Sequence, residues 1–429
     1  MPAERAFLVT IQLDPRFSAS AKGADRSESP WLLEDEAQEL KELVVSSGCR
    51  VVGELTARRH EPVAGTFLGG GKLEEVASLV QETQAQVVVV NQELSPAQQR
   101  NIEEIVRTKL IDRTQLILDI FAQRAKSQEG KVQVELAQLR YLLPRLVGKG
   151  VMLSRLGGGI GTRGPGEQKL EVDRRRIRDR ITRLGRELEQ LGRRRETVRS
   201  RRKETAIPVA ALVGYTNAGK TTLLNRATGA EAVARNQLFT TLDPLARRLK
   251  LPDGETVIMT DTVGFLHHLP HDLIEAFKAT LEEVLDADLI LHVLDASHPL
   301  ITEHAKAVEI VLKQLGLREK PIITVLNKRD QIQDMQKLAS LERAYAPAVA
   351  ISAKTGEGLS FLFSLMEQQL GSLLVEPVAL RIPAERSDLI ASIYQSGQVL
   401  RREEQDGTVK LLARLPAKLQ ASLSSYFAS

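Results

Sequence analysis

The clearest chemical signal in the sequence is a glycine-rich run that ends in lysine and threonine. Residues 214–221 match the spacing G-x-x-x-x-G-K-[ST] between an apolar stretch (208–213) and a helical segment that starts at Thr222. In that context backbone N–H groups curl around phosphates, Lys220 reaches the β- and γ-phosphates, and Thr221 ligates Mg²⁺. We therefore expect a phosphate-binding loop made of Gly214, Tyr215, Thr216, Asn217, Ala218, Gly219, Lys220, Thr221 and Thr222.

A second motif, Asp261-Thr262-Val263-Gly264, follows a predicted strand at Val257–Met259. An acidic residue at the end of a strand can hold the Mg²⁺ shell, and the N–H of a glycine three residues later can meet a γ-phosphate. The spacing thus predicts Asp261 as a metal ligand and Gly264 as a catalytic contact.

A third motif, Asn327-Lys328-Arg329-Asp330, follows a predicted strand at Ile322–Leu326. The Asp330 carboxylate can accept two hydrogen bonds from the N1–H and 2-amino groups of guanine, a pair that adenine cannot supply. Further along, Ala348–Ile351 leads into Ser352-Ala353-Lys354, whose backbone can reach the guanine O6. The D-x-x-G and N-K-x-D motifs are weak alone, but all these motifs, in this order and with this spacing, predict a GTP-binding switch domain.

Composition narrows the class of protein that can carry these motifs. The 429 residues have a formal net charge of +4 and include a single cysteine, which excludes an internal disulfide framework and a cysteine-based zinc site. The longest apolar stretches fall far short of the roughly 18 residues that a membrane span needs. We expect a cytoplasmic monomer without a membrane span, which leaves peripheral association with membranes open.

The length predicts about two to four domains at roughly 100–200 residues each. Strands alternate with helices in the first segment, including strands at Arg50–Thr56 and Val87–Val90 and a helix at Ser95–Lys109. We expect a multi-domain α/β protein with four parts: an N-terminal α/β domain (1–126), an antiparallel helical hairpin (127–204), a Ras-like P-loop GTPase domain (205–372) and a small α+β C-terminal domain (373–429).

The hairpin is expected because two apolar stripes with heptad spacing flank a glycine-rich connection at residues 148–166. The stripes are Val132, Leu136, Leu139, Leu143 and Leu146, then Ile177, Ile181, Leu184, Leu188 and Leu191. From Glu167 to Glu204 there are 15 lysines and arginines against eight acidic residues. This excess favours a polyanionic partner, most simply nucleic acid, over a merely solvated helix face.

The whole chain resembles the HflX family of bacterial ribosome-associated GTPases, which are related to translation factors. Besides the nucleotide motifs, the resemblance rests on residues 112–125, the glycine-rich stretch 157–167, and residues 238–244 and 269–273. It implies GTP as substrate, Mg²⁺ as cofactor, the large ribosomal subunit as partner, and separation of stalled or stressed ribosomes into subunits. The hairpin tip, with Arg163, would reach into ribosomal RNA.

The resemblance also assigns a switch I segment at Phe239, Thr240, Thr241, Leu242 and Asp243. Thr241 would complete the Mg²⁺ shell in the GTP state and take a catalytic role with Lys220, although the adjacent Thr240 is a competing choice. Phe265 follows Gly264, where many GTPases carry a glutamine that positions the attacking water, so slow intrinsic hydrolysis is implied. Asn217 either ligates K⁺ near the phosphates, as in similar GTPases, or only shapes the loop.

Three other functions stay open at this point. The first is a ribosome-assembly GTPase that chaperones ribosomal RNA without splitting mature particles. The second is an RNA-remodelling protein that uses ATP through its N-terminal domain, although that domain carries no P-loop spacing. The third is a tRNA-modification GTPase, for which the sequence offers no cofactor motif.

Overall fold

The structure is a computed structural model that describes residues 3–14, 31–146, 165–204, 207–229, 239, 245–266, 283–317, 320–371, 377–396, 398–405, 407–415 and 417–427. The chain divides into two compact units. Unit 1 comprises the described residues up to Glu189 together with Phe239, and unit 2 comprises those from Gln190 onward. The four-part division expected from the sequence is finer and stays a prediction.

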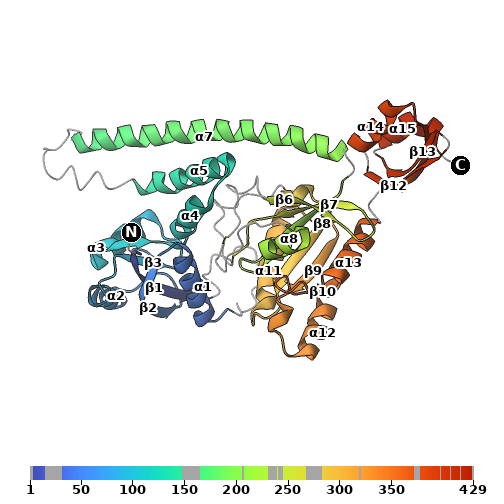
Figure 1. Ribbon diagram of the computed structural model, residues 1–429. Coiled ribbons are helices and arrows are strands. Elements are labelled where there is room, and N and C mark those ends of the chain that lie inside the picture. The colour runs from blue at the N-terminus through green and yellow to red at the C-terminus, as the bar shows by residue number, and fades with distance from the viewer. Residues whose placement is uncertain are drawn as a thin grey trace. The chain divides into compact units, whose positions relative to one another are not determined.

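Unit 1 contains a four-stranded parallel sheet in the order β2-β1-β3-β4 (Figure 1). The strands are β1 (Arg5–Leu13), β2 (Arg50–Arg59), β3 (Val87–Val90) and β4 (Lys109–Ile111), and the helices that alternate with them are α1 (Leu33–Ser46), α2 (Gly70–Glu82), α3 (Pro96–Val106) and α4 (Arg113–Arg124). The strand expected at Val87–Val90 is confirmed and buried at every residue, as a central parallel strand requires. The helix expected at Ser95–Lys109 ends earlier, at Val106, and its last expected residue opens β4.

Apolar residues on both faces of this sheet are covered by helices. Phe7, Val9 and Ile11 of β1 share a buried cluster with residues of α2 and α3. Helices α1 and α4 contact β1, β3 and each other. The N-terminal α/β fold expected from alternating strands and helices therefore forms around one sheet.

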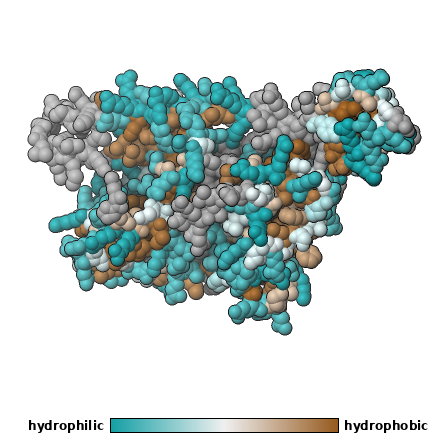
Figure 2. All heavy atoms as spheres, viewed as in Figure 1, coloured by the Kyte–Doolittle hydropathy of each residue, from teal (hydrophilic) through white to brown (hydrophobic). Residues whose placement is uncertain are grey.

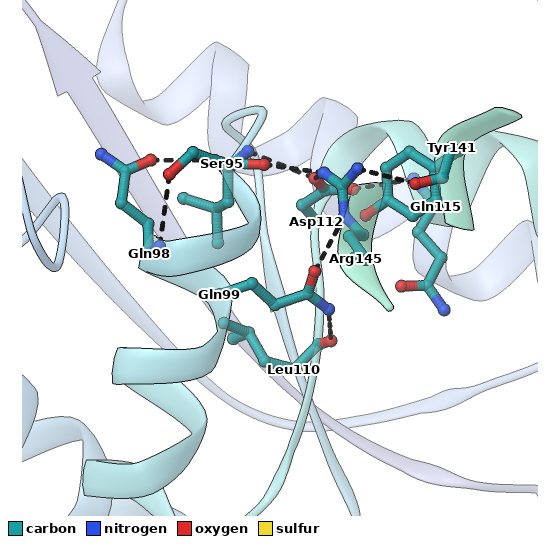
Figure 3. A network of polar contacts seen from close by, with 9 residues as sticks. Ser95, Gln98, Gln99, Leu110, Asp112, Gln115, Tyr141 and Arg145 are labelled. Atoms are coloured by element: carbon teal, nitrogen blue, oxygen red, sulfur yellow. Dashed lines mark hydrogen bonds and ion pairs between the residues drawn. The ribbon is translucent and has the colours of Figure 1, made fainter. Parts of the chain in front are cut away.

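A buried ion pair joins the next helix, α5 (Gln128–Arg145), to this sheet (Figure 3). The Asp112 carboxylate caps α4 by accepting hydrogen bonds from the Gln115 N–H at 2.8 Å and the Leu94 N–H at 3.2 Å. Arg145 donates to the same carboxylate at 3.1 Å and to the Leu94 carbonyl at 2.7 Å. Its guanidinium also lies 3.4 Å from the centre of the Tyr141 ring. These contacts fix the last turn of α5.

The expected hairpin pairs α5 with α7 (Pro165–Glu204), a single helix of 40 residues. Val132, Leu136 and Leu139 of α5 pack against Ile181, Leu184 and Leu188 of α7, so the two heptad stripes meet. Arg180 of α7 makes two hydrogen bonds to the Glu135 carboxylate of α5, at 2.6 and 2.7 Å. The glycine-rich tip, including Arg163, lies outside the described residues.

Unit 2 contains a six-stranded sheet in the order β10-β9-β8-β5-β7-β6. The strands are β5 (Val209–Gly214), β6 (Leu245–Lys250), β7 (Thr256–Asp261), β8 (Leu289–Asp295), β9 (Ile322–Asn327) and β10 (Ala348–Ala350). All neighbours pair in parallel except β6, which pairs antiparallel with β7. The carboxyl ends of the parallel strands therefore lie along one edge, the edge at which open α/β sheets bind ligands.

Helices cover both faces of this sheet. On one face α8 (Lys220–Thr228) and α13 (Leu359–Gly371) share a core with β5, β7, β8 and β9. On the other, α11 (Ile301–Gln314) and α12 (Met335–Ala344) contribute Ile301, Ala305 and Leu338 to a second cluster. This is the Ras-like arrangement that the motif order predicted.

The C-terminal segment of unit 2 forms a three-stranded antiparallel sheet, β11-β13-β12, with its own core. Its elements are β11 (Val378–Pro383), α14 (Ser387–Ser396), β12 (Gln398–Gln405), β13 (Thr408–Arg414), α15 (Ala417–Leu423) and a 3₁₀ turn (Ser424–Tyr426). The expected order of strand, helix, two strands and short helix is confirmed. In the part of the chain that the structure describes, no helix combines the length and apolar character needed to cross a bilayer.

Candidate nucleotide-binding site

The P-loop connects the end of β5 to the first turn of α8. Gly219 begins this turn with φ of +98°, and a Cβ atom there would lie 2.2 Å from the side-chain nitrogen of Asn327. Glycine is therefore required twice at Gly219, for its backbone angle and for the close approach. Asn217, also expected to contact the nucleotide, has a left-handed φ of +61°. The loop therefore makes the tight turn between strand and helix that a P-loop needs.

Lys220 is buried within the loop that it is expected to serve. Its ammonium donates to the Gly214 carbonyl at 3.0 Å and to the Tyr215 carbonyl at 2.9 Å. Burial lowers its pKa to about 8, and the negative charge of Asp261 partly offsets that effect. An anionic phosphate beside this ammonium would supply the charge partner that the buried position favours.

Thr221 and Asp261, the two described members of the expected Mg²⁺ shell, lie side by side. The Thr221 hydroxyl donates to the Asp261 carboxylate at 2.7 Å, and both residues are buried. A hydroxyl and a carboxylate are the hard oxygen ligands that Mg²⁺ prefers. The two side chains therefore fit a magnesium ion, which when bound would neutralise charge on the β- and γ-phosphates.

The D-x-x-G motif runs from the end of β7 across the P-loop. Thr262 anchors it by donating to the Leu212 carbonyl at 2.6 Å. A Cβ atom on Gly264 would lie 2.8 Å from Thr216 and 3.1 Å from the Lys220 ammonium, so its backbone lies directly on the phosphate-binding loop. Phe265 is 3% exposed, and its backbone exchanges hydrogen bonds with Gly214 and Thr216. The structure thus places Gly264 beside Lys220, and Val263, the residue before it, is buried. The contact of Gly264 with a γ-phosphate stays a prediction.

The residues expected to recognise guanine converge from two strand ends. Asn327 donates to the Ala218 carbonyl at 2.7 Å and accepts from the Ala353 N–H at 2.9 Å, which ties the P-loop to the Ser352-Ala353-Lys354 loop. The Ser352 hydroxyl donates to the exposed Asp330 carboxylate at 2.6 Å and so orients it.

Arg329, the third residue of this motif, forms an ion pair with Glu357 at 3.2 Å. Its own N–H donates to the Ile351 carbonyl, which holds the N-K-x-D segment against the Ser352 loop. Lys354 is exposed and Thr222 is half-buried in α8. Recognition of guanine by Asp330 stays a prediction.

Of the switch I segment, the structure describes Phe239. Its side chain packs against another aromatic residue, a contact that the expected nucleotide-binding role did not predict. Its side chain is 2% exposed and meets the ring of Phe121 in α4 edge to face, with centroids 4.6 Å apart. Thr240, Thr241, Leu242 and Asp243 lie outside the described residues. Their contacts with the nucleotide, and the role of Thr241 in Mg²⁺ binding and catalysis, stay predictions.

Three residues that support the site were not expected from the sequence. Asp295 ends β8 and forms an ion pair with Lys328 at 2.6 Å. Arg226 of α8 donates to the Thr355 carbonyl at 2.7 Å, which braces the loop after Ser352. His292, buried in β8, has a pKa lowered to about 4 by burial and by the charge of Lys220. Of these, Asp295 carried a signal, because it ends a buried parallel strand as Asp261 does.

Comparison with protein families gives four matches in succession along the chain. Residues 34–122 match a family described as GTP-binding GTPase N-terminal, and residues 124–202 match GTP-binding GTPase Middle Region. Residues 209–328 match 50S ribosome-binding GTPase, and residues 337–425 match the HflX C-terminal domain.

Similar proteins cover nearly the whole chain. GTPase HflX of Caldanaerobacter subterraneus subsp. tengcongensis is 48% identical over 92% of this chain and 91% of its own. GTPase HflX of Escherichia coli (strain K12) is 44% identical over 89% and 90%, and that of Akkermansia muciniphila is 40% identical over 99% and 97%.

Among solved structures, a GTP-binding protein from the hyperthermophilic archaeon Sulfolobus solfataricus in complex with GDP is 24% identical, covers 86% of this chain and 99% of its own, and has a TM-score of 0.45. The order of the nucleotide motifs, the four family matches and the HflX relatives agree along the sequence. The chain is a GTP-hydrolysing enzyme and belongs to the HflX family of GTPases.

Proposed function

We propose that this GTPase binds the large ribosomal subunit in its GTP state through the basic hairpin, and that it separates stalled or stressed ribosomes into subunits. The observation that carries the proposal is an arginine face on α7. This face comprises five exposed residues: Arg175, Arg176, Arg178, Arg183 and Arg186.

The arginine face lies opposite the apolar seam of the hairpin. At 100° per residue, Arg175, Arg178 and Arg186 project from the side of α7 away from the buried Leu184. Figure 2 has hydrophilic residues along the outer side of α7 and hydrophobic ones where it meets α5. Among the exposed residues of 175–186, Asp179 is the acidic one. Packing against α5 therefore leaves the positive charge directed outward.

This face suits an RNA backbone. Residues 175–186 span about 17 Å of helix axis at 1.5 Å per residue, enough to follow several successive phosphates. Guanidinium groups bind phosphate in a bidentate manner and lose less hydration than ammonium groups do. Double-stranded RNA is recognised mainly through its backbone and shape, so a stripe of arginines without interleaved aromatic side chains fits a structured RNA.

The nucleotide would control this binding through the switch segments. A Cβ atom on Gly264 would lie 3.1 Å from the Lys220 ammonium, so a γ-phosphate bound by Lys220 would also contact the Gly264 backbone and shift it. Because the next residue, Phe265, is hydrogen-bonded to the P-loop, this shift would alter switch II, the segment that begins at Asp261. The ribosome-binding conformation would then form with GTP and be lost after hydrolysis.

Sedimentation with purified large subunits tests the binding. The wild-type chain with a non-hydrolysable GTP analogue should co-sediment, and the variant Arg178→Gln/Arg183→Gln/Arg186→Gln should bind more weakly, with its salt slope lower by roughly one per arginine removed. The matched control is Arg381→Gln/Arg401→Gln/Arg402→Gln, three exposed arginines of the C-terminal sheet. Equal losses in both triple variants would contradict the assignment of α7 as the RNA surface.

We also propose that K⁺ binds beside Asn217 and assists hydrolysis, since Phe265 cannot hydrogen-bond an attacking water. Asn217 is half-buried in the P-loop and has a left-handed backbone, which supports a defined position for this residue beside the phosphates. Hydrolysis should be faster in K⁺ than in Na⁺ at equal ionic strength, and Asn217→Ala should remove the difference. Equal rates in the two buffers would contradict K⁺ binding.

A further inference from the structure

The segment that runs from the end of β8 into α11 contacts two of the nucleotide-binding motifs, the N-K-x-D segment and the P-loop. Asp295, at its start, forms the ion pair with Lys328, and the Ala296 N–H donates to the Asn327 carbonyl at 2.9 Å. The Ser297 N–H turns back to the Asp295 carboxylate at 3.0 Å. This end of the loop is therefore fixed to the guanine-reading segment.

The other end of the loop enters helix α11 through two histidines. Nδ1 of His298 accepts a hydrogen bond from the Leu300 N–H at 3.1 Å, which fixes the ring at the start of the helix. His304 lies in the first turn of α11, where its N–H donates to the Leu300 carbonyl at 3.0 Å. Its side chain is buried, at 8% exposure.

The ring of His304 stacks on the ring of Tyr215, the second residue of the P-loop. The two centroids lie 3.8 Å apart and the ring planes differ by 6°. His298 lies on the His304 ring with centroids 4.4 Å apart and a tilt of 36°. The three rings form a column from α11 to the phosphate-binding loop, and the near-parallel planes fix the orientation of the Tyr215 ring.

The backbone around Tyr215 connects Lys220 to Phe265, the residue that follows Gly264. Its carbonyl accepts from the Lys220 ammonium at 2.9 Å. Alongside it, the Thr216 N–H donates to the Phe265 carbonyl at 2.8 Å, and the Phe265 N–H donates to the Gly214 carbonyl at 3.1 Å. Rotation of residue 215 would therefore move the Lys220 acceptor and the start of switch II together.

We propose that His304 is a positioning residue for GTP hydrolysis, because its ring, stacked on Tyr215, sets the P-loop backbone between Lys220 and Phe265. A planar ring is needed because it restricts tilt of the Tyr215 ring, whereas an aliphatic side chain of similar volume fills space without fixing that plane. Since Phe265 cannot orient a water, the hydrolysis rate depends more on the positions of the P-loop backbone and of the Lys220 ammonium. The inference rests on the GTPase activity and is independent of ribosome binding.

The test compares three substitutions at His304 in the full chain by single-turnover GTP hydrolysis, GDP affinity and thermal unfolding. His304→Phe keeps a planar ring and should retain at least a third of the wild-type rate. His304→Leu fills the site without a planar ring and should lower the rate about tenfold or more while GDP affinity and unfolding temperature stay near those of His304→Phe. His304→Ala should lower the rate at least as far as leucine.

The control is His60→Leu, the same chemical change at a histidine of unit 1 whose side chain is 94% exposed. It should leave the rate unchanged. Equal rates for His304→Leu and His304→Phe would overturn the proposal, because filling the space would then suffice. A rate loss in His304→Leu that merely follows a fall in unfolding temperature or in GDP affinity would also overturn it.

Discussion

The hydroxyl of Thr221 donates a 2.7 Å hydrogen bond to the carboxylate of Asp261, which joins the first turn of α8 to the end of β7. Two side-chain oxygens from separate motifs, which we expect to bind Mg²⁺, are thereby brought together beside the buried ammonium of Lys220. Parallel strands bring this about, because Gly214 and Asp261 end neighbouring strands of the same sheet.

Replacing Asp261 with asparagine should weaken Mg²⁺ binding and so the Mg²⁺ dependence of GTP hydrolysis. The amide lacks the negative charge that a divalent cation needs, and a metal ion supplies several kcal/mol to the transition state of phosphoryl transfer. We expect the hydrolysis rate to fall by roughly 100-fold or more and its Mg²⁺ dependence to weaken, as measured by GTP turnover over a magnesium titration. Asp288→Asn, an exposed position that accepts from the Val209 N–H, is the control. Unchanged magnesium dependence in Asp261→Asn would rule out this metal site.

Replacing Asp330 with asparagine should alter base specificity. The carboxylate loses an acceptor for guanine, and the amide gains a donor that suits xanthine, which carries a carbonyl where guanine carries its 2-amino group. GTP affinity should fall by roughly 100-fold or more, while xanthosine triphosphate should bind more tightly than it does to the wild type. Competition with a fluorescent guanine nucleotide measures both. Asp334→Asn, which changes the N-cap of α12, should leave specificity unchanged; if Asp330→Asn behaves in the same way, Asp330 does not read the base.

The motifs could be predicted because each is a short run at the end of a buried strand. Asp261, Asn327 and Ser352 follow apolar stretches whose direction in a parallel sheet is almost forced. By contrast, the antiparallel strand β6 was not expected, because Arg247 and Arg248 give it the polar pattern of an exposed edge.

Contacts between distant residues carried no local signal. Asp112 and Arg145 are 33 positions apart, and Tyr215 and His304 are on different elements. Taken singly, Asp112 has the pattern of an ordinary helix cap, Arg145 that of a surface arginine, and Tyr215 and His304 those of ordinary ring side chains. Pairing was decided by tertiary packing, which a single sequence does not encode in any short pattern.

Removing Arg145 should destabilise unit 1. Arg145→Met leaves the Asp112 carboxylate fully buried without its cation, and breaking such a pair costs about 3–5 kcal/mol. Unfolding in urea can be followed by the fluorescence of Trp31, the single tryptophan of the chain, which is buried in unit 1. The double variant Asp112→Asn/Arg145→Met should lose less than the sum of the single losses. Arg180→Met, which breaks the more exposed pair with Glu135, should cost much less; equal costs would refute a buried network.

Unit 1 should lose stability as the pH rises from about 5 to 7. Burial raises the pKa of Glu36 to about 7 and the charge of Glu39 adds to this, while Arg113, Gln12 and Asn91 act in the opposite direction. The folded state therefore holds a proton that the unfolded chain releases near pH 4.5, so the unfolding free energy falls through this window and then levels off.

Glu36→Gln should abolish this decline and stabilise unit 1 at pH 8 by about 1–2 kcal/mol, since glutamine keeps an acceptor for the Asn91 amide. Urea unfolding followed by Trp31 at several pH values measures it. Glu39→Gln, which removes the ion-pair partner of the buried Arg113, should destabilise at every pH. A wild-type profile that is flat between pH 5 and 7 would contradict the account.

The most direct test of the central claim is sedimentation of intact 70S ribosomes on a sucrose gradient after incubation with the full chain. With a non-hydrolysable GTP analogue we expect the 70S peak to give way to separate subunits, with the protein on the large subunit. With GDP the particles should stay intact and free of protein. Intact 70S ribosomes with the GTP analogue, and protein bound to free large subunits alone, would contradict splitting and favour a role in assembly.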